Sequence, residues 1–139
     1  MKKVVLISCV KKKLDHEAKA EDLYISPYFI KNLQYAKSIN PDNIFILSAK
    51  YGLLKLDDKI VPYDKTLNKM KTNEIRKWAE SVLNQLKSVS DLDNDEFIFL
   101  TGDKYRKFLI LHIKHYKIPM LGLGIGKQLQ WLKENINNE

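Results

Sequence analysis

The chain has 139 residues, of which 45% are hydrophobic and 29% charged, and its net charge is +7. This length fits one domain, and the composition excludes an intrinsically disordered chain. The apolar run from Val4 to Ile7 is too short for a signal peptide core or a membrane span, so we expect a single cytoplasmic domain. A single cysteine, Cys9, excludes an internal disulfide, and with only three histidines we expect no metal site.

The positive charge is concentrated at the two ends of the chain. Residues 1–20 carry six lysines and two acids, and residues 101–139 carry seven basic and three acidic residues, so each block has a charge of +4. If the ends meet in the fold, their potentials add and attract an anion such as phosphate, a nucleotide or nucleic acid. A surplus of solubilising lysines would give the same distribution without any ligand.

The first half of the chain predicts a strand, a helix and a second strand. Val4 to Ile7 and Ile44 to Leu47 are short, continuous apolar runs, which indicate strands covered on both faces. Between them, Ser26 and Pro27 supply the N-cap and first turn of a helix that ends near Asn40. This pattern favours a parallel sheet.

The second half begins with a long connection and continues with helices and strands. From Ala49 to Lys71 no period is clear, and we expect a packed loop. Apolar residues at helical spacing predict a helix from about Asn73 to Val89, and Phe97 to Leu100 predicts a third strand. Asp103 then caps a third helix with an inward stripe formed by Tyr105, Phe108, Leu109, His112, Ile113 and Tyr116.

The last two elements complete the predicted fold. Ile118 to Leu121 predicts a fourth strand, which we place at an edge because Pro119 cannot donate a ladder hydrogen bond. A final helix follows Gly126. The whole chain is therefore expected to form one α/β domain with three layers, α/β/α, around a mostly parallel sheet of about four strands. Such sheets bind ligands beyond the carboxyl ends of their strands.

The first strand runs into Ser8, Cys9, Lys11 and Lys12. Neighbouring ammonium groups favour the thiolate, so Cys9 is a candidate catalytic nucleophile. The alternative is that Cys9 is a small buried residue that closes the strand. Ser8, Lys11 and Lys12 are candidates for binding an anionic substrate.

The second predicted strand leads to Lys50, and Asp64 follows later in the long loop. Both are candidate catalytic residues, with Asp64 as a general base or metal contact. The candidate substrate-binding residues of this region are Ser48, Tyr51, Gly52 and Tyr63. Glycine allows a tight turn, and tyrosine rings stack on bases. Alternatively, the tyrosines pack under the loop and Asp64 caps a turn before Thr66.

The third and fourth turns carry further candidate substrate-binding residues. Gly102 and Arg106 follow the third strand, where a bound anion would offset the unfavourable position of Arg106 in the first turn of a helix. Gly124 and Gly126 expose amides that could hold phosphate at the head of the last helix, although neither a Rossmann glycine fingerprint nor a Walker loop is present. We expect His112 in the core; His115 is expected at the surface. Alternatively, Gly102, Gly124 and Gly126 only allow tight turns of the chain and bind no ligand.

Five motifs together resemble a bacterial and phage domain family of unknown function over nearly the whole chain: LISCVKKK, DLYISPYF, FILSAKYGLL, VPYDKTL and GLGIGKQLQWLK. More distantly, the segment Tyr51-Gly52-Leu53-Leu54, with Ile60 and Pro62-Tyr63, is similar to the YaaA peroxide-stress protein family, which is associated with DNA binding. Ser8-Cys9, the following lysines and Tyr24 resemble a domain of archaeosine synthase, an enzyme of tRNA base modification, in which proline precedes the cysteine. Both likenesses imply a nucleic acid or nucleobase.

These observations predict an enzyme directed at a nucleotide or nucleic acid, acting on a base or its N-glycosidic bond. The alternative is a DNA- or RNA-binding module that uses a basic sheet edge without catalysis. A third hypothesis is a small-molecule or redox-sensing protein centred on Cys9. Enclosure of Lys50, Tyr63, Asp64 and Cys9 around one pocket would favour the enzyme. The sequence names no cofactor and no oligomeric state.

Overall fold

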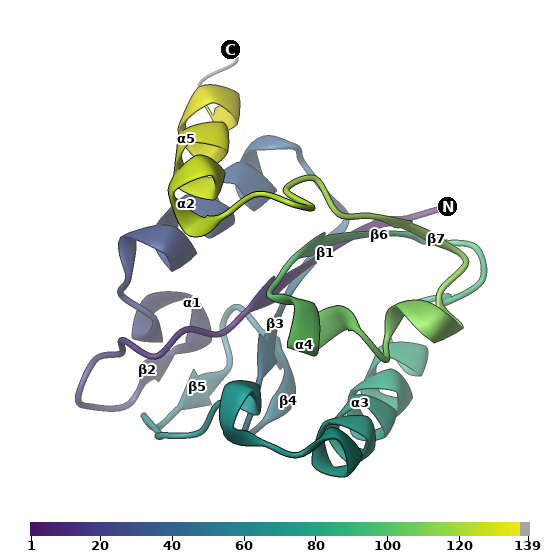
Figure 1. Ribbon diagram of the computed structural model, residues 1–139, viewed down its shortest axis with the longest axis horizontal. Helices are drawn as coiled ribbons and strands as arrows, with labels where there is room; N and C mark the ends of the chain where they lie inside the picture. Colours follow the sequence, from purple (N-terminus) through teal and green to yellow (C-terminus); the bar gives the residue numbers. More distant parts are fainter. Residues whose placement is uncertain (137–139) are drawn as a thin grey trace.

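The computed structural model describes residues 1–136 and has an α/β fold built on a five-stranded sheet (Figure 1). The strand order is β4-β3-β1-β6-β7; β1, β3, β6 and β7 are parallel, and β4 runs antiparallel to β3. The strands are β1 (Lys3–Ser8), β3 (Asn43–Ser48), β4 (Gly52–Lys55), β6 (Glu96–Leu100) and β7 (His115–Lys117). The predicted mostly parallel sheet is confirmed, with five strands instead of about four.

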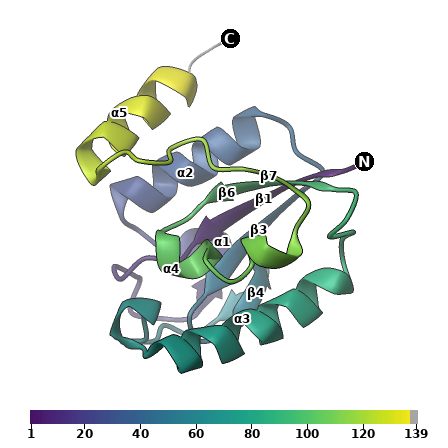
Figure 2. The same ribbon diagram turned by 45° about the vertical axis from the view of Figure 1, so that its right-hand side comes forward.

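Helices cover both faces of the sheet, as the three-layer prediction requires (Figure 2). The helices α2 (Pro27–Ser38) and α5 (Ile125–Ile136) pack together on one face, and α3 (Thr72–Lys87) packs against the other next to β4. Ser26 caps α2 as predicted, because its hydroxyl accepts a hydrogen bond from the Phe29 amide at 3.2 Å. Within residues 1–136 no helix has both the length and the apolar character needed to cross a bilayer.

Short elements fill the connections between these layers. They are β2 (Ala18–Lys19), α1 (Ala20–Leu23), β5 (Lys59–Ile60), the 3-10 turn η1 (Leu67–Lys69), α4 (Asp103–Arg106) and the 3-10 turn η2 (Ile110–His112). β2 pairs with β5 in a separate two-stranded sheet. The long connection after β3 is thus packed, as expected, but it also contains strand β4, which the sequence pattern did not predict.

The predicted third helix is broken in the structure. α4 ends at Arg106, and the next turns close with tighter hydrogen bonds, such as the one from the Leu109 amide to the Arg106 carbonyl. Gly102 is the N-cap, and the Asp103 side chain makes no capping bond. The prediction was wrong because the apolar spacing suits both a helix and a series of turns. His112 was predicted in the core but is exposed. His115 is exposed, as predicted.

The predicted fourth strand is displaced by a few residues. β7 consists of the polar residues His115–Lys117, whereas the apolar residues Ile118 to Leu121 form the turn that follows. Pro119 lacks the amide hydrogen that a ladder needs, and an edge strand exposed on both faces tolerates polar side chains. The predicted edge position of this strand is confirmed.

The topology creates a crevice at the carboxyl ends of β1 and β6. From β1 the chain passes through α2 to β3 on one side, and from β3 it passes through α3 to β6 on the other side of β1. The carboxyl end of β1 leads through α2 to β3, and that of β6 leads through α4 to β7, so the connections from these two neighbouring strands run in opposite directions along the sheet. In open α/β sheets, ligands bind at this point where the strand order reverses.

Candidate active site

Three of the four predicted turns meet at the carboxyl edge of the sheet. The Cys9 amide donates to the Leu47 carbonyl at 2.9 Å, which joins the ends of β1 and β3. The Gly102 amide donates to the Ser8 hydroxyl oxygen at 3.4 Å, which joins the ends of β1 and β6. Ser8 is buried, and this hydrogen bond makes its hydroxyl a link between the two strand ends.

A pocket of about 410 Å³ opens at this edge, next to the crevice between β1 and β6. We call it the Cys9 pocket. It is lined by the segment after β1, by the loop before and within η1, and by α4, through Cys9, Val10, Lys11, Lys13, Asp64, Lys65, Thr66, Asn68, Lys69 and Tyr105. Cys9, Lys11 and Asp64 were predicted as site residues, and the structure brings them into one pocket.

Cys9 lies at the wall of the pocket and is 9% exposed. Its Sγ atom is 3.4 Å from the hydroxyl oxygen of Tyr105, a contact in which either group can donate. The same hydroxyl accepts a hydrogen bond from the Leu67 amide at 3.5 Å. Burial raises the pKa of Tyr105 above its ordinary value, and the nearby Cys9 acts in the same direction. Tyr105 is therefore a neutral phenol beside the thiol at neutral pH.

Lys13 is the basic residue that the structure holds most firmly in the pocket. Its ammonium donates to the Lys11 carbonyl at 3.0 Å and lies 4.6 Å from the centre of the Tyr63 ring. Burial lowers its pKa, and the nearby Cys9 and Asp64 oppose this shift. Lys11 and Lys13 both line the pocket, whereas Lys12 between them does not, as expected where alternate side chains point to the same side.

The loop from Asp64 to Lys69 forms the opposite wall. Asp64 is exposed, and Thr66 provides the cap of η1 by accepting a hydrogen bond from the Asn68 amide at 3.2 Å. The Asp64 carboxylate is therefore not needed as the cap of this turn. The Lys104 ammonium donates to the Asn68 carbonyl at 3.2 Å and fastens this wall to α4.

Tyr63 and Ser48 belong to a hydrogen-bonded network next to Lys13. The Ser48 hydroxyl donates to the Tyr63 hydroxyl at 2.8 Å and accepts from the amides of Lys50 and Tyr51 at 3.2 and 3.0 Å. The Tyr63 and Tyr24 hydroxyls are 2.6 Å apart, and burial raises the pKa of both. The structure thus gives Ser48 and Tyr63 structural contacts, with the Tyr63 ring facing Lys13.

Lys50, predicted with the catalytic residues, lies in a neighbouring hollow of about 470 Å³. We call it the Lys50 hollow. Its lining residues are Ala49, Lys50, Tyr51, Gly52, Lys65, Met70, Glu74, Lys77, Trp78 and Ser81. Gly52 has a φ of +74°, and a side chain there would overlap Gln85, so this glycine is required by the turn between β3 and β4.

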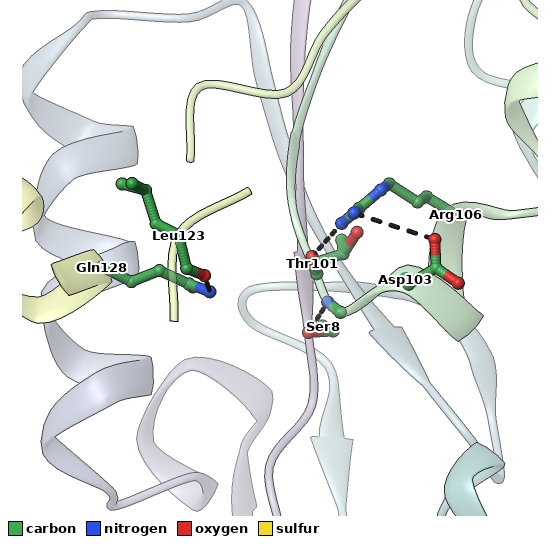
Figure 3. Close-up of polar contacts among 7 residues, drawn as sticks. Ser8, Thr101, Asp103, Arg106, Leu123 and Gln128 are labelled. Carbon is green, nitrogen blue, oxygen red and sulfur yellow. Dashed lines mark hydrogen bonds and ion pairs between the residues drawn. The ribbon is translucent and has the colours of Figure 1, made fainter. Parts of the chain in front are cut away.

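Arg106 and the glycine turn lie outside the Cys9 pocket, which corrects the prediction that all four turns share one hollow. Figure 3 shows Arg106 on one side of the end of β1, and Leu123 and Gln128 on the other. The guanidinium of Arg106 donates to the Thr101 carbonyl, and Gln128 donates to the Leu123 carbonyl at 2.7 Å.

The glycine turn is held against α2, which explains its separation from the pocket. Gln128 accepts a hydrogen bond from the Tyr28 hydroxyl, so the start of α5 is fastened to α2. Gly124 and Gly126 are exposed, and a side chain added at either would meet no atom within 4 Å. Arg106 lies at the end of α4 and not in the first turn of a long helix.

Several lining residues were not predicted as site residues: Val10, Lys13, Lys65, Thr66, Asn68, Lys69 and Tyr105. Lys13 belongs to the lysine cluster after β1 and could have been found from its spacing to Lys11. Tyr105 was assigned to the core; it is indeed buried, but its hydroxyl reaches the pocket. In residues 1–136 no three His, Cys, Asp or Glu side chains gather as metal ligands.

Comparison with known proteins places the chain in a family. Neither the curated proteins nor the solved structures include a significant match to it. A family model described as a family of unknown function, DUF6884, matches residues 4–134 and thus nearly the whole chain, including every lining residue of the Cys9 pocket. The chain therefore belongs to the DUF6884 family.

Proposed function

We propose that the protein is an enzyme directed at a nucleotide or nucleic acid, which acts on a base or on its N-glycosidic bond. The observation that carries this proposal is the composition of the Cys9 pocket, in which a thiol and a carboxylate share the walls with four lysines, Lys11, Lys13, Lys65 and Lys69. Lysines bind phosphate, while thiols and carboxylates serve as nucleophiles and proton acceptors. The resemblance of two segments to nucleic-acid-associated families supports the choice of substrate.

In this proposal the two sides of the pocket bind different parts of the substrate. Lys11, Lys65 and Lys69 bind phosphate, and Thr66 and Asn68 add hydrogen-bonding groups on the wall that carries Lys65 and Lys69. The apolar surfaces of Val10 and Tyr105 lie beside Cys9 and suit a sugar or base. The position of the pocket next to the crevice between β1 and β6 agrees with the general location of ligands in such sheets.

The groups in the pocket suffice for hydrolysis of an N-glycosidic bond. Asp64 accepts a proton from a water molecule, the water oxygen bonds to C1′, and the bond from C1′ to the base nitrogen breaks. The leaving base takes its proton from the Lys13 ammonium, whose lowered pKa makes it a better acid than an ordinary lysine. Alternatively, the Cys9 thiol passes its proton to Asp64 and its sulfur bonds to C1′ as the bond from C1′ to the base nitrogen breaks; water then cleaves the bond between sulfur and C1′ and returns a proton to the thiolate. Substitution of Cys9 by serine separates these routes, because unchanged activity excludes Cys9 as the nucleophile.

The experiment measures release of free base by chromatography from nucleoside monophosphates and from single-stranded DNA and RNA. We expect Asp64→Asn to abolish release while substrate binding stays nearly intact. Asp57→Asn, at an exposed acid away from the pocket, is the matched control and should behave as the wild type. Full activity of Asp64→Asn would refute the assignment of Asp64.

The rival function is a binding module without catalysis, and two observations favour it. Of the four residues whose enclosure would favour the enzyme, only Cys9 and Asp64 line the Cys9 pocket, whereas Lys50 and Tyr63 do not. Basic side chains continue beyond the Cys9 pocket to Lys50 and Lys77 in the Lys50 hollow. A binding module would show affinity that falls steeply with salt, no base release with any substrate, and parallel loss of binding in every lysine variant.

A further inference from the structure

We infer that the substrate is a single-stranded nucleic acid rather than a free nucleotide, an inference that rests on the proposed function and names its substrate class. The reacting nucleotide occupies the Cys9 pocket, and its neighbour along the strand occupies the Lys50 hollow. Four observations carry this inference: the contiguity of the hollows, their size, their charge and their aromatic side chains.

A third hollow, of about 200 Å³, shares lining residues with both the Cys9 pocket and the Lys50 hollow. This linking hollow is lined by Asp64, Lys65, Thr66, Lys69, Met70 and Glu74. Lys65 lines all three hollows, Asp64 and Thr66 are shared with the Cys9 pocket, and Met70 and Glu74 are shared with the Lys50 hollow. The three hollows therefore follow one another around the loop that contains η1.

The size of these hollows exceeds what one nucleotide needs. The Cys9 pocket alone, at about 410 Å³, is in the range of pockets that enclose a small ligand. The linking hollow and the Lys50 hollow, of about 200 and 470 Å³, extend the available space beyond this pocket. A strand that continues past its reacting nucleotide uses all three.

The charge along the three hollows matches a phosphate backbone. Two acids, Asp64 and Glu74, line the three hollows, and the lysines outnumber them. The six lysines are Lys11, Lys13, Lys50, Lys65, Lys69 and Lys77. The Glu74 carboxylate already accepts a hydrogen bond from the Lys71 amide at 3.0 Å, which caps α3. Positive charge spread over several adjoining hollows suits a chain of phosphates better than one phosphate.

The aromatic side chains of the Lys50 hollow favour a single strand over a duplex. Tyr51 and Trp78 both line it and are partly buried. The Trp78 indole donates to the Ser48 carbonyl at 2.9 Å, and the Tyr51 ring lies edge-on to Tyr63 with centres 5.5 Å apart, so both rings are held in place. Bases stack on such rings only when their faces are free, as they are in single strands.

The experiment measures binding of fluorescent single-stranded oligonucleotides, as DNA and as RNA, by anisotropy, with AMP and a duplex of the same sequence as competitors. We expect affinity to rise with oligonucleotide length and to exceed that of AMP by at least about tenfold. Lys77→Glu should weaken oligonucleotide binding about tenfold and reduce its salt dependence. Lys87→Glu makes the same charge change on α3 outside the three hollows and should leave binding unchanged.

Two results would overturn the inference: AMP or the duplex binding as tightly as the single strands, or Lys77→Glu and Lys87→Glu weakening binding equally. These results are distinct from failure of the proposed function. Base release from AMP that requires Asp64, without a preference for longer strands, would reject the single strand and keep the enzyme. Length-dependent binding with no base release from any substrate would keep the single strand and reject the enzyme.

Discussion

The Sγ atom of Cys9 lies 3.4 Å from the hydroxyl of Tyr105, although 96 residues separate the two positions. Cys9 follows β1 and Tyr105 lies in α4, directly after β6, so their contact spans the crevice where the strand order reverses. The fold thus places the single thiol of the chain between a buried phenol and a cluster of lysines.

The buried tyrosines predict loss of stability at alkaline pH. Burial raises the pKa of Tyr24, Tyr63 and Tyr105 above the ordinary value of 10.0. Because these hydroxyls ionise more readily in the unfolded chain, their contribution to stability is complete below pH 10.0 and is lost as the pH rises above it. We expect tyrosinate absorbance to rise together with loss of circular dichroism. Ionisation of all the tyrosines in a chain that stays folded would contradict this account.

Lys13 predicts a pH dependence of AMP binding, because its charge adds to the positive potential of the pocket. Its pKa is lowered from 10.5 by burial, so its ammonium loses its charge at a lower pH than an exposed lysine. Affinity for AMP, measured by calorimetry, should therefore fall as the pH rises through this pKa. Lys13→Arg keeps its charge throughout and should retain affinity over that range. Lys69→Arg, at an exposed lysine of the same pocket, should keep the wild-type midpoint. A wild-type midpoint in Lys13→Arg would remove Lys13 from the explanation.

Gly52 predicts a large effect of a small substitution. With a φ of +74°, alanine is strained there, and its Cβ would displace Gln85, whose side chain accepts from the Leu53 amide at 2.9 Å. Gly52→Ala should reduce the free energy of unfolding by about 1–3 kcal/mol in urea titrations. Gly124→Ala, where a side chain meets open space, should change it by less than about 0.5 kcal/mol. Similar values for the two variants would contradict the strain.

Ser48 predicts a loss of stability through unsatisfied hydrogen bonds. Its hydroxyl is fully buried and bonds to Tyr63 and to the amides of Lys50 and Tyr51. Ser48→Ala leaves these groups without their partner, and we expect a loss of about 1–3 kcal/mol in thermal or urea unfolding. Ser88→Ala removes a single exposed hydrogen bond and is the control. A smaller loss in Ser48→Ala than in Ser88→Ala would refute this role.

Much of the fold follows from local sequence pattern. The strands β1, β3 and β6 are continuous apolar runs, and α3 has a regular apolar stripe, so composition and period identify them without tertiary information. β7 was misplaced because its residues are polar and only its pairing with β6 makes it a strand. The helix expected after Asp103 was wrong because turns and helix share the same apolar spacing.

The candidate site was predictable only in part. Cys9, Lys11 and Asp64 stood out as reactive or charged residues near strand ends, and the topology brings them together. Lys65 and Lys69 were not singled out, because they belong to the middle of the chain, where acids balance the basic residues and no local charge surplus exists. The orientation of Arg106, away from the pocket and toward Thr101, depends on the short length of α4, which no local pattern indicates.

The location of substrate binding can be measured through Cys9 itself, since every thiol adduct of this chain reports that one residue. The rate of its alkylation by iodoacetamide would be followed by mass spectrometry, with and without a single-stranded oligonucleotide whose binding is monitored in the same sample. At about ten times the dissociation constant, binding in the Cys9 pocket should slow the reaction about tenfold. An unchanged alkylation rate with the oligonucleotide bound would show that the ligand sits elsewhere and would contradict the assignment of this pocket.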